Sequence, residues 1–344
     1  MKSIYLPFLI SFVISLALTP VVIKVGPKLG FLDIPKDNRR MHKRPMPIAG
    51  GIAIYIAATV AILVFIPLNK NILSLIIGST IILISGLLDD KYSISPKAKI
   101  AFQLAAGLMI ALSGSQIEFF TNIISTKEVV WLKYLSIPVT LFWICGITNT
   151  VNLIDGLDGL AAGVSLISAV SLMCIALKMN HVAVAIIAAA VGGSCLGFLP
   201  YNFNPAKIFM GDTGALYLGF MLSYISIQGV MKYATTLMIF VPVLVLGVPV
   251  FDTAFAMIRR YISGKKIFDA DKGHLHHRLL ALGLTQRQTV LILYAISLIF
   301  GILANVISDF DPVIGIIISL LIIILIFLVG WISGMFKTVK KEEK

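Results

Sequence analysis

Long, uninterrupted apolar runs constrain the fold of this sequence more than any other feature. The run from Val313 to Val329 contains no charged residue. About 20 apolar residues are needed to cross the hydrocarbon core of a bilayer, so a run of this kind predicts a transmembrane helix. Only 13% of the residues are charged, whereas a soluble domain has roughly 25%. We therefore expect an all-α, polytopic integral membrane protein.

Breaks in hydropathy predict about eleven transmembrane helices. The predicted helices cover residues 4–24, 49–67, 72–88, 98–113, 131–148, 160–178, 182–199, 214–231, 235–258, 288–307 and 312–335. The first is too long for a signal peptide and many spans follow it, so we expect it to be retained. Residues 1–344 are expected to form a single transmembrane domain that ends in a basic tail, 337–344.

The placement of Lys and Arg predicts the orientation. Of the 28 basic residues, 22 fall in the alternate loops 24–48, 89–99, 200–213 and 259–287 and in the tail. By the positive-inside rule this side is cytoplasmic, the N-terminus is outside and the C-terminus is inside. The same asymmetry, together with attraction to anionic membrane lipid, accounts for the net charge of +12, so no nucleic-acid partner is expected.

The acidic residues gather on the same side, where twelve of the sixteen Asp and Glu residues fall. Topology makes no demand on where acids go. Their concentration beside the basic loops predicts one polar active site on the cytoplasmic face.

Asp89 and Asp90 end the third predicted span. Two adjacent carboxylates at a helix C-terminus are opposed by the helix dipole and by each other. A bound divalent cation or a general-base role would offset that cost. The alternative is a solvated boundary pair assisted by Lys91.

Asn149, Asn152, Asp155 and Asp158 recur every three residues, and Gly156 and Gly159 allow the helix to open there. Amides and acids that converge on an interrupted helix at a membrane boundary are typical of a binding site. The alternative is a polar turn between two spans.

Asp212 lies in the glycine-containing segment Phe209-Met-Gly-Asp212 ahead of the eighth span. It suits Mg²⁺ held against phosphates, and the alternative is a helix cap. Asp252 lies within an apolar stretch, where an acid is functional by default; the alternative is that it lies close enough to the interface to be solvated. No cysteine accompanies His274-Leu-His-His-Arg278, so we expect phosphate contacts there rather than zinc. The three cysteines all fall inside apolar runs, with neither metal spacing nor a disulfide framework.

The sequence contains no serine–histidine triad, phosphate-binding Walker loop or dinucleotide-binding fingerprint. Carboxylates, amides and basic groups without an activated nucleophile suit phosphoryl transfer, where positioning and metal electrostatics dominate. A secondary transporter is the alternative, but transporters place polar groups near the midplane and often carry inverted repeats. Here the acids lie at span ends on one face.

The chain resembles the polyprenyl-phosphate N-acetylhexosamine-1-phosphate transferases, and within them the TagO/WecA branch of undecaprenyl-phosphate N-acetylglucosaminyl 1-phosphate transferases. The resemblance runs in order from about Asp33 to Leu280. It is carried by Asp37-x-Arg-x-x-His42, Pro47-x-x-Gly-Gly51, Asp89-Asp90, Asn149-x-x-Asn-x-x-Asp-Gly-x-Asp-Gly159, Phe209-Met-Gly-Asp212 and His274-x-His-His-Arg278.

The resemblance implies transfer of GlcNAc-1-phosphate from UDP-GlcNAc to undecaprenyl phosphate, release of UMP, and a need for Mg²⁺ or Mn²⁺. It implies catalytic roles for Asp89 and Asp90, of which Asp90 deprotonates the lipid phosphate, and metal binding by Asp212 and Asn152. Residues implied to contact the nucleotide sugar are Asn149, Asp155, Asp158, Asn202, Phe209 (by stacking on uracil), His276, His277 and Arg278. Those implied to bind the lipid phosphate are Lys99, Arg39 and His42.

The MraY branch has three consecutive histidines where this chain has His276-His277-Arg278. The departure implies UDP-GlcNAc, or another UDP-N-acetylhexosamine, in preference to UDP-MurNAc-pentapeptide. It leaves open the downstream glycan, which could be teichoic acid, the O-antigen of lipopolysaccharide or another envelope polymer. Family resemblance also implies a cytoplasmic (inner) membrane location and a homodimer.

Overall fold

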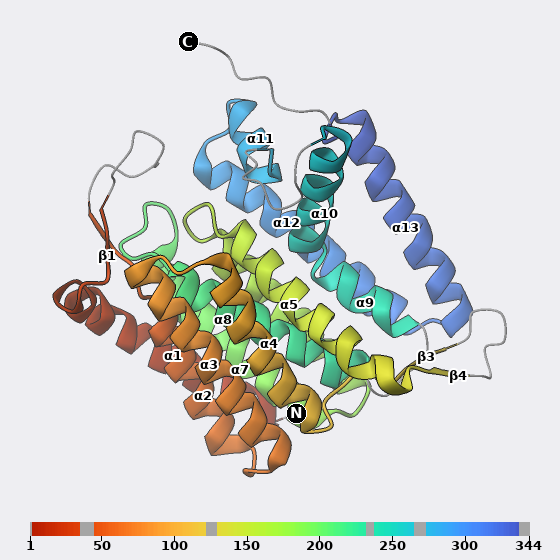
Figure 1. Ribbon diagram of the computed structural model, residues 1–344, viewed down its shortest axis with the longest axis horizontal. Helices are drawn as coiled ribbons and strands as arrows, with labels where there is room; N and C mark the ends of the chain where they lie inside the picture. The colour runs from red at the N-terminus through yellow and green to blue at the C-terminus, as the bar shows by residue number, and fades with distance from the viewer. Residues whose placement is uncertain (1, 35–44, 122–128, 232–236, 265–272, 337–344) are drawn as a thin grey trace.

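The computed structural model describes the chain except for residues 1, 35–44, 122–128, 232–236, 265–272 and 337–344. It is a bundle of helices with two short β-hairpins (Figure 1). Its α-helices are α1 (Lys2–Val25), α2 (Gly51–Phe65), α3 (Lys70–Tyr92), α4 (Pro96–Leu112), α5 (Ser136–Ile154), α6 (Leu160–Lys178), α7 (Val182–Asn202), α8 (Gly211–Ser226), α9 (Leu237–Val245), α10 (Gly247–Ile262), α11 (Leu275–Ala281), α12 (Gln286–Ile307) and α13 (Pro312–Ile332). The hairpins pair β1 (Leu32–Asp33) with β2 (Met46–Pro47) and β3 (Phe119–Thr121) with β4 (Val129–Trp131).

Every one of the eleven predicted spans overlaps a helix, which confirms a polytopic membrane protein. Seven helices in the described part are long and apolar enough to cross a membrane, and an eighth span results if the bent pair α9–α10 counts as one. The segments 49–67, 98–113 and 214–231 form the shorter helices α2, α4 and α8. The described residues therefore do not confirm the predicted count of about eleven spans.

The ninth predicted span, 235–258, was expected to be one helix, and this expectation is wrong. The chain breaks at Leu246, whose backbone leaves the helical region, and α9 and α10 meet at an angle of 91°. Pro242 and Pro249 flank the break. Proline removes a backbone hydrogen bond, so helices kink or break beside it. Hydropathy does not register such a break because both halves are apolar.

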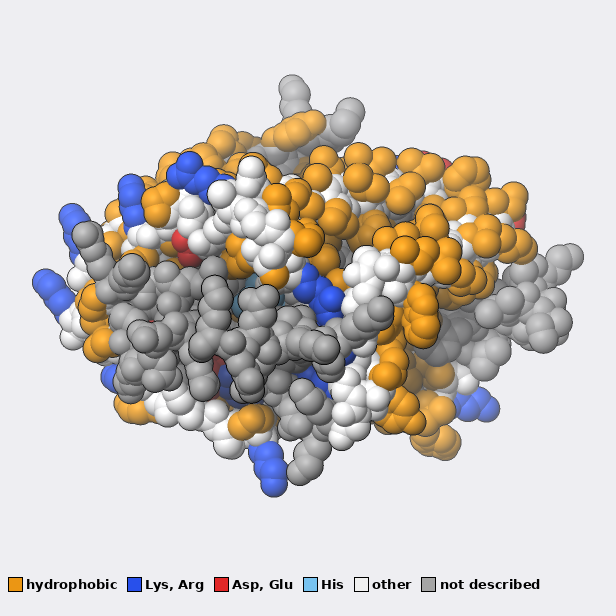
Figure 2. All heavy atoms as spheres, turned by 90° about the horizontal axis from the view of Figure 1, so that it is seen from above, with side chains coloured by type: hydrophobic (Ala, Val, Ile, Leu, Met, Phe, Trp, Pro, Cys, Tyr) orange, Lys and Arg blue, Asp and Glu red, His pale blue; other side chains and the backbone are white. Residues whose placement is uncertain are grey.

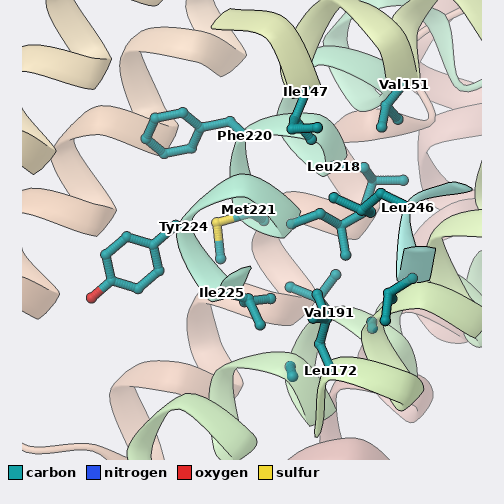
Figure 3. Close-up of a cluster of buried hydrophobic side chains, with 14 of the residues drawn as sticks. Ile147, Val151, Leu172, Val191, Leu218, Phe220, Met221, Tyr224, Ile225 and Leu246 are labelled. Atoms are coloured by element: carbon teal, nitrogen blue, oxygen red, sulfur yellow. The ribbon is translucent and has the colours of Figure 1, made fainter. Parts of the chain in front are cut away.

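Helix α8 forms the centre of the bundle, and nearly all of its residues are buried. Small residues let its neighbours approach closely, as is common between membrane helices. A Cβ atom on Gly219 would lie 2.6 Å from the Cα of Thr148 in α5, and one on Gly51 would lie 2.2 Å from the backbone nitrogen of Gly214. Figure 3 shows the α8 side chains surrounded by apolar residues from α5, α6 and α7.

The two ends of the bundle differ in the elements that they contain. Figure 1 shows α11 and the end of α13 at one end of the bundle and the β3–β4 hairpin at the other. Helices α3, α5 and α7 finish at the α11 end, and α8 and α12 begin there. That end therefore brings together the termini that carry the polar motifs.

Candidate active site

A cavity of about 650 Å³ lies where the α5–α6 turn, the α7–α8 loop and the first hairpin meet. Its lining residues are Asp33, Met46, Ile48, Asn152, Asp155, Gly156, Leu157, Asp158, Asn202, Asn204, Pro205, Ala206, Phe209, Met210, Gly211, Asp212, His277 and Gln286. Figure 2 looks onto this end of the molecule, where Lys and Arg side chains are spread over the surface and one flank is mainly hydrophobic. Cavities of roughly 300–1,000 Å³ hold ligands of cofactor size.

At this end of the bundle a lysine lies between two aspartates. The Nζ atom of Lys99 lies 2.7 Å from Oδ2 of Asp89 and 2.5 Å from Oδ2 of Asp212. The side chains are 16–26% exposed, so they are open to a ligand while shielded from bulk water. Asp212 also lines the cavity, and its carboxylate is hydrogen-bonded to Asn152. Asp89, Lys99, Asp212 and Asn152, predicted from separate motifs, therefore lie together.

The side chain of Asp90 points toward the start of α8. Its oxygens accept hydrogen bonds from the backbone nitrogens of Asp212 (2.9 Å) and Thr213 (3.1 Å) and from the Thr213 hydroxyl (2.5 Å). The N-cap of α8 is Met210, which supplies no capping side chain. The alternative in which Asp212 caps α8 is therefore wrong, because Asp90 satisfies these backbone groups.

The α5–α6 turn is open as its glycines predicted. Helix α5 ends at Ile154, and Gly159 has a positive φ of 81°. Asp158 accepts hydrogen bonds from the side chain of Asn204 and the backbone nitrogen of Ala206, both at 3.0 Å. Asn202 accepts from the nitrogen of Gly159 and donates to the carbonyl of Ile208. Asp158 and Asn202 thus hold the two loops of the cavity together.

Asp155 has no such partner among the described residues and lines the cavity. Burial, followed by the negative charges of Asp212, Asp90 and Asp158, raises the pKa of Asp155 from 3.8 to about 8. The site therefore carries more negative charge than its own cations balance. A bound cation would relieve this excess.

This pKa shift predicts how the stability of the metal-free protein depends on pH. Between about pH 4 and pH 8 the folded protein retains a proton on Asp155 that the unfolded chain has released. Stability therefore falls as pH rises through this window and levels off above pH 8. We expect thermal unfolding of the metal-free protein in detergent to show a falling melting temperature from pH 6 to 8.5. Asp155→Asn should flatten this slope, and an unchanged slope in that variant would contradict the assignment.

The histidine cluster begins helix α11. Nδ1 of the buried His274 lies 2.8 Å from Oδ2 of Asp252, and the other Asp252 oxygen accepts from the nitrogen of Leu275 at 2.7 Å. Asp252, predicted to be functional because it lies in an apolar stretch, thus fixes the position of the cluster. The ring of His276 is stacked with that of His274, with centroids 5.8 Å apart, and is tilted by 45° from that of His277, with centroids 4.2 Å apart.

Within this cluster His277 lines the cavity, whereas Arg278 does not. Burial and then the neighbouring His277 lower the pKa of His276 to about 4, so that its ring is neutral at pH 7. The Arg278 guanidinium donates to the carbonyls of Gly273, Gly334 and Met335. Those contacts anchor the segment after α13 to α11.

Of the four remaining predicted residues, one lines the cavity, one lies apart from it and two lie outside the described chain. Asn149 exchanges hydrogen bonds with Gln103 of α4 and is not among the lining residues. Phe209 lines the cavity, and its backbone pairs with Pro47 and Gly50. Arg39 and His42 lie outside the described residues.

Three further polar residues line the cavity and were not predicted, namely Asp33, Asn204 and Gln286. The amide nitrogen of Asn204 donates to Asp158 and to the Gln286 oxygen, at 3.0 and 2.8 Å. Asn204 stands two residues after Asn202 and directly before Pro205, a pattern that could have identified it. Gln286 begins an ordinary apolar helix, and nothing local distinguishes it.

The oxygen donors fit a divalent metal ion. No group of three His, Cys, Asp or Glu residues converges as a complete ligand set within the described part of the chain. Mg²⁺ usually takes only one or two carboxylates and fills its remaining positions with water and substrate phosphates. The Asp212 carboxylate, the Asn152 amide and the nearby Asp89 match that requirement.

We compared the chain with models of protein families and with curated proteins, and both comparisons find related glycosyl or phosphosugar transferases. Residues 72–230 match the model of glycosyl transferase family 4. This range includes α3, α5 and α8, which supply Asp89, Asn152 and Asp212.

Curated relatives cover nearly the whole chain. A probable undecaprenyl-phosphate N-acetylglucosaminyl 1-phosphate transferase of Bacillus subtilis is 41% identical over 97% of this chain and 93% of its own length. An undecaprenyl-phosphate alpha-N-acetylglucosaminyl 1-phosphate transferase of Thermotoga maritima is 32% identical, over 85% and 87%. A phospho-N-acetylmuramoyl-pentapeptide-transferase of Thermoanaerobacter is 31% identical, over 87% and 96%.

Proposed function

We propose that this chain, which belongs to glycosyl transferase family 4, transfers GlcNAc-1-phosphate from UDP-GlcNAc to undecaprenyl phosphate and releases UMP. The observation that carries the proposal is the Lys99 ammonium held between the Asp89 and Asp212 carboxylates at the edge of the cavity. A site with this charge pattern can hold a diphosphate and a metal ion together.

We infer that the reaction takes place at the cytoplasmic face of the cytoplasmic membrane. The cavity is lined in part by residues of the segments 24–48 and 259–287, in which Lys and Arg concentrate in the sequence, and the positive-inside rule favours a cytoplasmic location for such segments. At that level the phosphate of a membrane lipid can meet a water-soluble nucleotide sugar.

In the proposed step an oxygen of the lipid phosphate attacks the β-phosphorus of the UDP-sugar in line. The bond between this phosphorus and the oxygen that bridges to the α-phosphate breaks. UMP leaves with the bridging oxygen, and the sugar remains bonded to its phosphate in the lipid diphosphate.

The residues of the chain have separate parts in this step. Lys99 balances the negative charge of the phosphates that approach Asp89 and Asp212. His277, Phe209 and Asp155 line the cavity that receives the nucleotide sugar. Asp212 and Asn152 would hold the metal ion, with Mg²⁺ as the proposed ion and Mn²⁺ as a substitute. When bound, such an ion neutralises charge on the diphosphate and on the departing UMP.

A two-step route, in which an aspartate attacks first and forms a covalent phosphosugar intermediate, uses the same residues. The two routes differ when acceptor lipid is absent. A stoichiometric burst of UMP without lipid would indicate the covalent route, and strict dependence of UMP release on lipid would indicate direct attack.

The relatives support GlcNAc as the transferred sugar. Identity to the Bacillus subtilis N-acetylglucosaminyl transferase is 41%, against 31% for the Thermoanaerobacter muramoyl-pentapeptide transferase. We expect purified protein with undecaprenyl phosphate and Mg²⁺ to release UMP from UDP-GlcNAc faster than from UDP-GalNAc or UDP-MurNAc-pentapeptide. Preference for either of the other donors would correct the sugar and leave the reaction class intact.

A glycine in the cavity wall supplies a prediction for donor binding. A Cβ atom on Gly156 would lie 2.6 Å from Nε2 of His276, so Gly156→Ala forces the α5–α6 turn and the histidine cluster apart. We expect the KM for UDP-GlcNAc to rise roughly tenfold, equivalent to about 1.4 kcal/mol of lost binding. Gly146→Ala is the matched control, since a Cβ at Gly146 meets nothing within 4 Å. An equal KM in both variants would contradict the proposed donor pocket.

A further inference from the structure

We infer that Asp90 is a positioning residue that fixes the start of α8, and with it Asp212, and that it is not the base that deprotonates the lipid phosphate. A base that deprotonates the lipid phosphate exists only in the reaction proposed above, so this part of the inference rests on the proposed function. The contacts that carry it are independent of the substrate.

The hydrogen bonds of Asp90 are those of a helix cap supplied from another helix. The first backbone N–H groups of an α-helix have no partner within the helix. One Asp90 oxygen accepts from the nitrogen of Asp212 and the other from the nitrogen and the hydroxyl of Thr213. A carboxylate in this position is also favoured by the positive end of the helix dipole.

Close backbone packing shows that α3 and the start of α8 fit together over about one turn of α3. Gly86 lies one turn before Asp90, and a Cβ atom there would lie 2.3 Å from the Cα of Thr213. Gly211 has a positive φ of 70°, and its Cβ would lie 2.5 Å from an Asp90 oxygen. Asp90 thus closes a contact that leaves no room for a side chain on either glycine.

Asp89 and Asp90 consequently have different surroundings. Adjacent residues on a helix point about 100° apart. Asp89 faces Lys99 and the cavity residue Asp212, whereas Asp90 faces the backbone of α8. Of the two acids, Asp89 is the one placed to contact the reacting phosphates.

The consequence for Asp212 is direct, because Asp90 holds the backbone nitrogen of that residue. Without this hydrogen bond, the backbone position of Asp212, the residue that would hold the metal ion, is less well fixed. Asp90 therefore affects metal binding without touching the metal or the substrate.

The test compares Asp90→Asn, Thr213→Val and the double variant in purified full-length protein. Two quantities are measured without turnover, namely the melting temperature of the metal-free protein and the Mg²⁺ concentration that gives half of the maximal thermal shift. Turnover at saturating Mg²⁺ is measured separately as UMP release.

If Asp90 is a positioning residue, Asp90→Asn lowers the melting temperature and raises the half-saturating Mg²⁺ concentration roughly tenfold, the effect of one lost charge-assisted hydrogen bond. Thr213→Val also lowers the melting temperature and raises the half-saturating Mg²⁺ concentration, but by less than Asp90→Asn does. The double variant is no worse than Asp90→Asn, since the two residues act through one contact.

If Asp90→Asn retains the wild-type melting temperature and Mg²⁺ requirement while turnover falls a hundredfold or more, the inference is overturned. Fully additive effects of the two substitutions on Mg²⁺ binding also overturn it. Should Asp90→Asn fail to fold, an unchanged Mg²⁺ requirement in folded Thr213→Val overturns it alone. A wild-type protein that releases no UMP would refute the proposed function, and the thermal and Mg²⁺ measurements would still decide the role of Asp90.

Discussion

Asp212→Ala is expected to reduce UMP release from UDP-GlcNAc by roughly 10³-fold or more, because a metal ion supplies several kcal/mol of charge stabilisation in such a step. Asp212 joins the two parts of the site: it lines the cavity and forms an ion pair with Lys99. The substitution removes the carboxylate that would hold the metal ion. Excess Mg²⁺ should restore little of the activity. The measurement is the initial rate of UMP release across a series of Mg²⁺ concentrations.

The chain provides a matched control at the other end of the bundle. Asp309 forms an ion pair with Lys178 at 2.7 Å, far from the cavity. Asp309→Ala removes the same kind of group from the same kind of pair and should leave the rate within about twofold, since an exposed ion pair contributes little. Comparable losses in the two variants would show that the Asp212 effect is not specific to the site.

Lys99→Met is expected to lower turnover by roughly 10²-fold, the typical cost of removing one group that stabilises developing charge. The same substitution should lower the Mg²⁺ concentration needed for half-maximal activity. The ammonium occupies the space between Asp89 and Asp212, and its removal leaves two carboxylates that attract a cation more strongly. Slower turnover combined with tighter metal binding distinguishes this variant from Asp212→Ala.

Lys178→Met serves as the control for Lys99, since its Nζ pairs with Asp309 and the carbonyl of Asn305 outside the site. We expect it to match the wild type in turnover and in Mg²⁺ requirement. If Lys99→Met required more Mg²⁺ than the wild type, Lys99 would be assisting the metal site and not competing with the metal for the carboxylates.

The membrane helices could be predicted from sequence because a bilayer imposes both their length and their apolar character. The break at Leu246 was missed because α9 and α10 are both apolar, although Pro242 and Pro249 on either side of it could have indicated it. Helix α11 was also missed, since it has only seven residues and begins where Asp252 holds Leu275 from another helix.

Part of the site could be predicted. Asp89, Asn152 and Asp212 belong to separate polar motifs and Lys99 was implied by the family resemblance, and the four residues lie together. Sequence could not separate Asp89 from Asp90, because adjacent residues differ only in the direction in which the folded helix points them. Nor could it predict the contacts of Arg278, whose guanidinium donates to the carbonyls of Gly334 and Met335, 56 and 57 residues later in the chain.

The loops of the cavity illustrate a second limit. Asn202 and Asp158 look like ligand-binding residues in sequence, yet much of their hydrogen-bonding capacity holds one loop to the other. Gln286 enters the cavity from a helix more than a hundred residues after the α5–α6 turn. Only the tertiary structure brings such distant segments to one site.

The central claim, that the sugar moves together with its phosphate, is tested most directly with UDP-GlcNAc that carries radioactive phosphorus at the β-position. Purified protein is incubated with this donor, undecaprenyl phosphate and Mg²⁺, and the lipid and aqueous phases are separated. We predict that the label enters the lipid phase and that the released nucleotide is unlabelled UMP. Label recovered in the aqueous phase as UDP, with the sugar on the lipid, would contradict the proposed reaction.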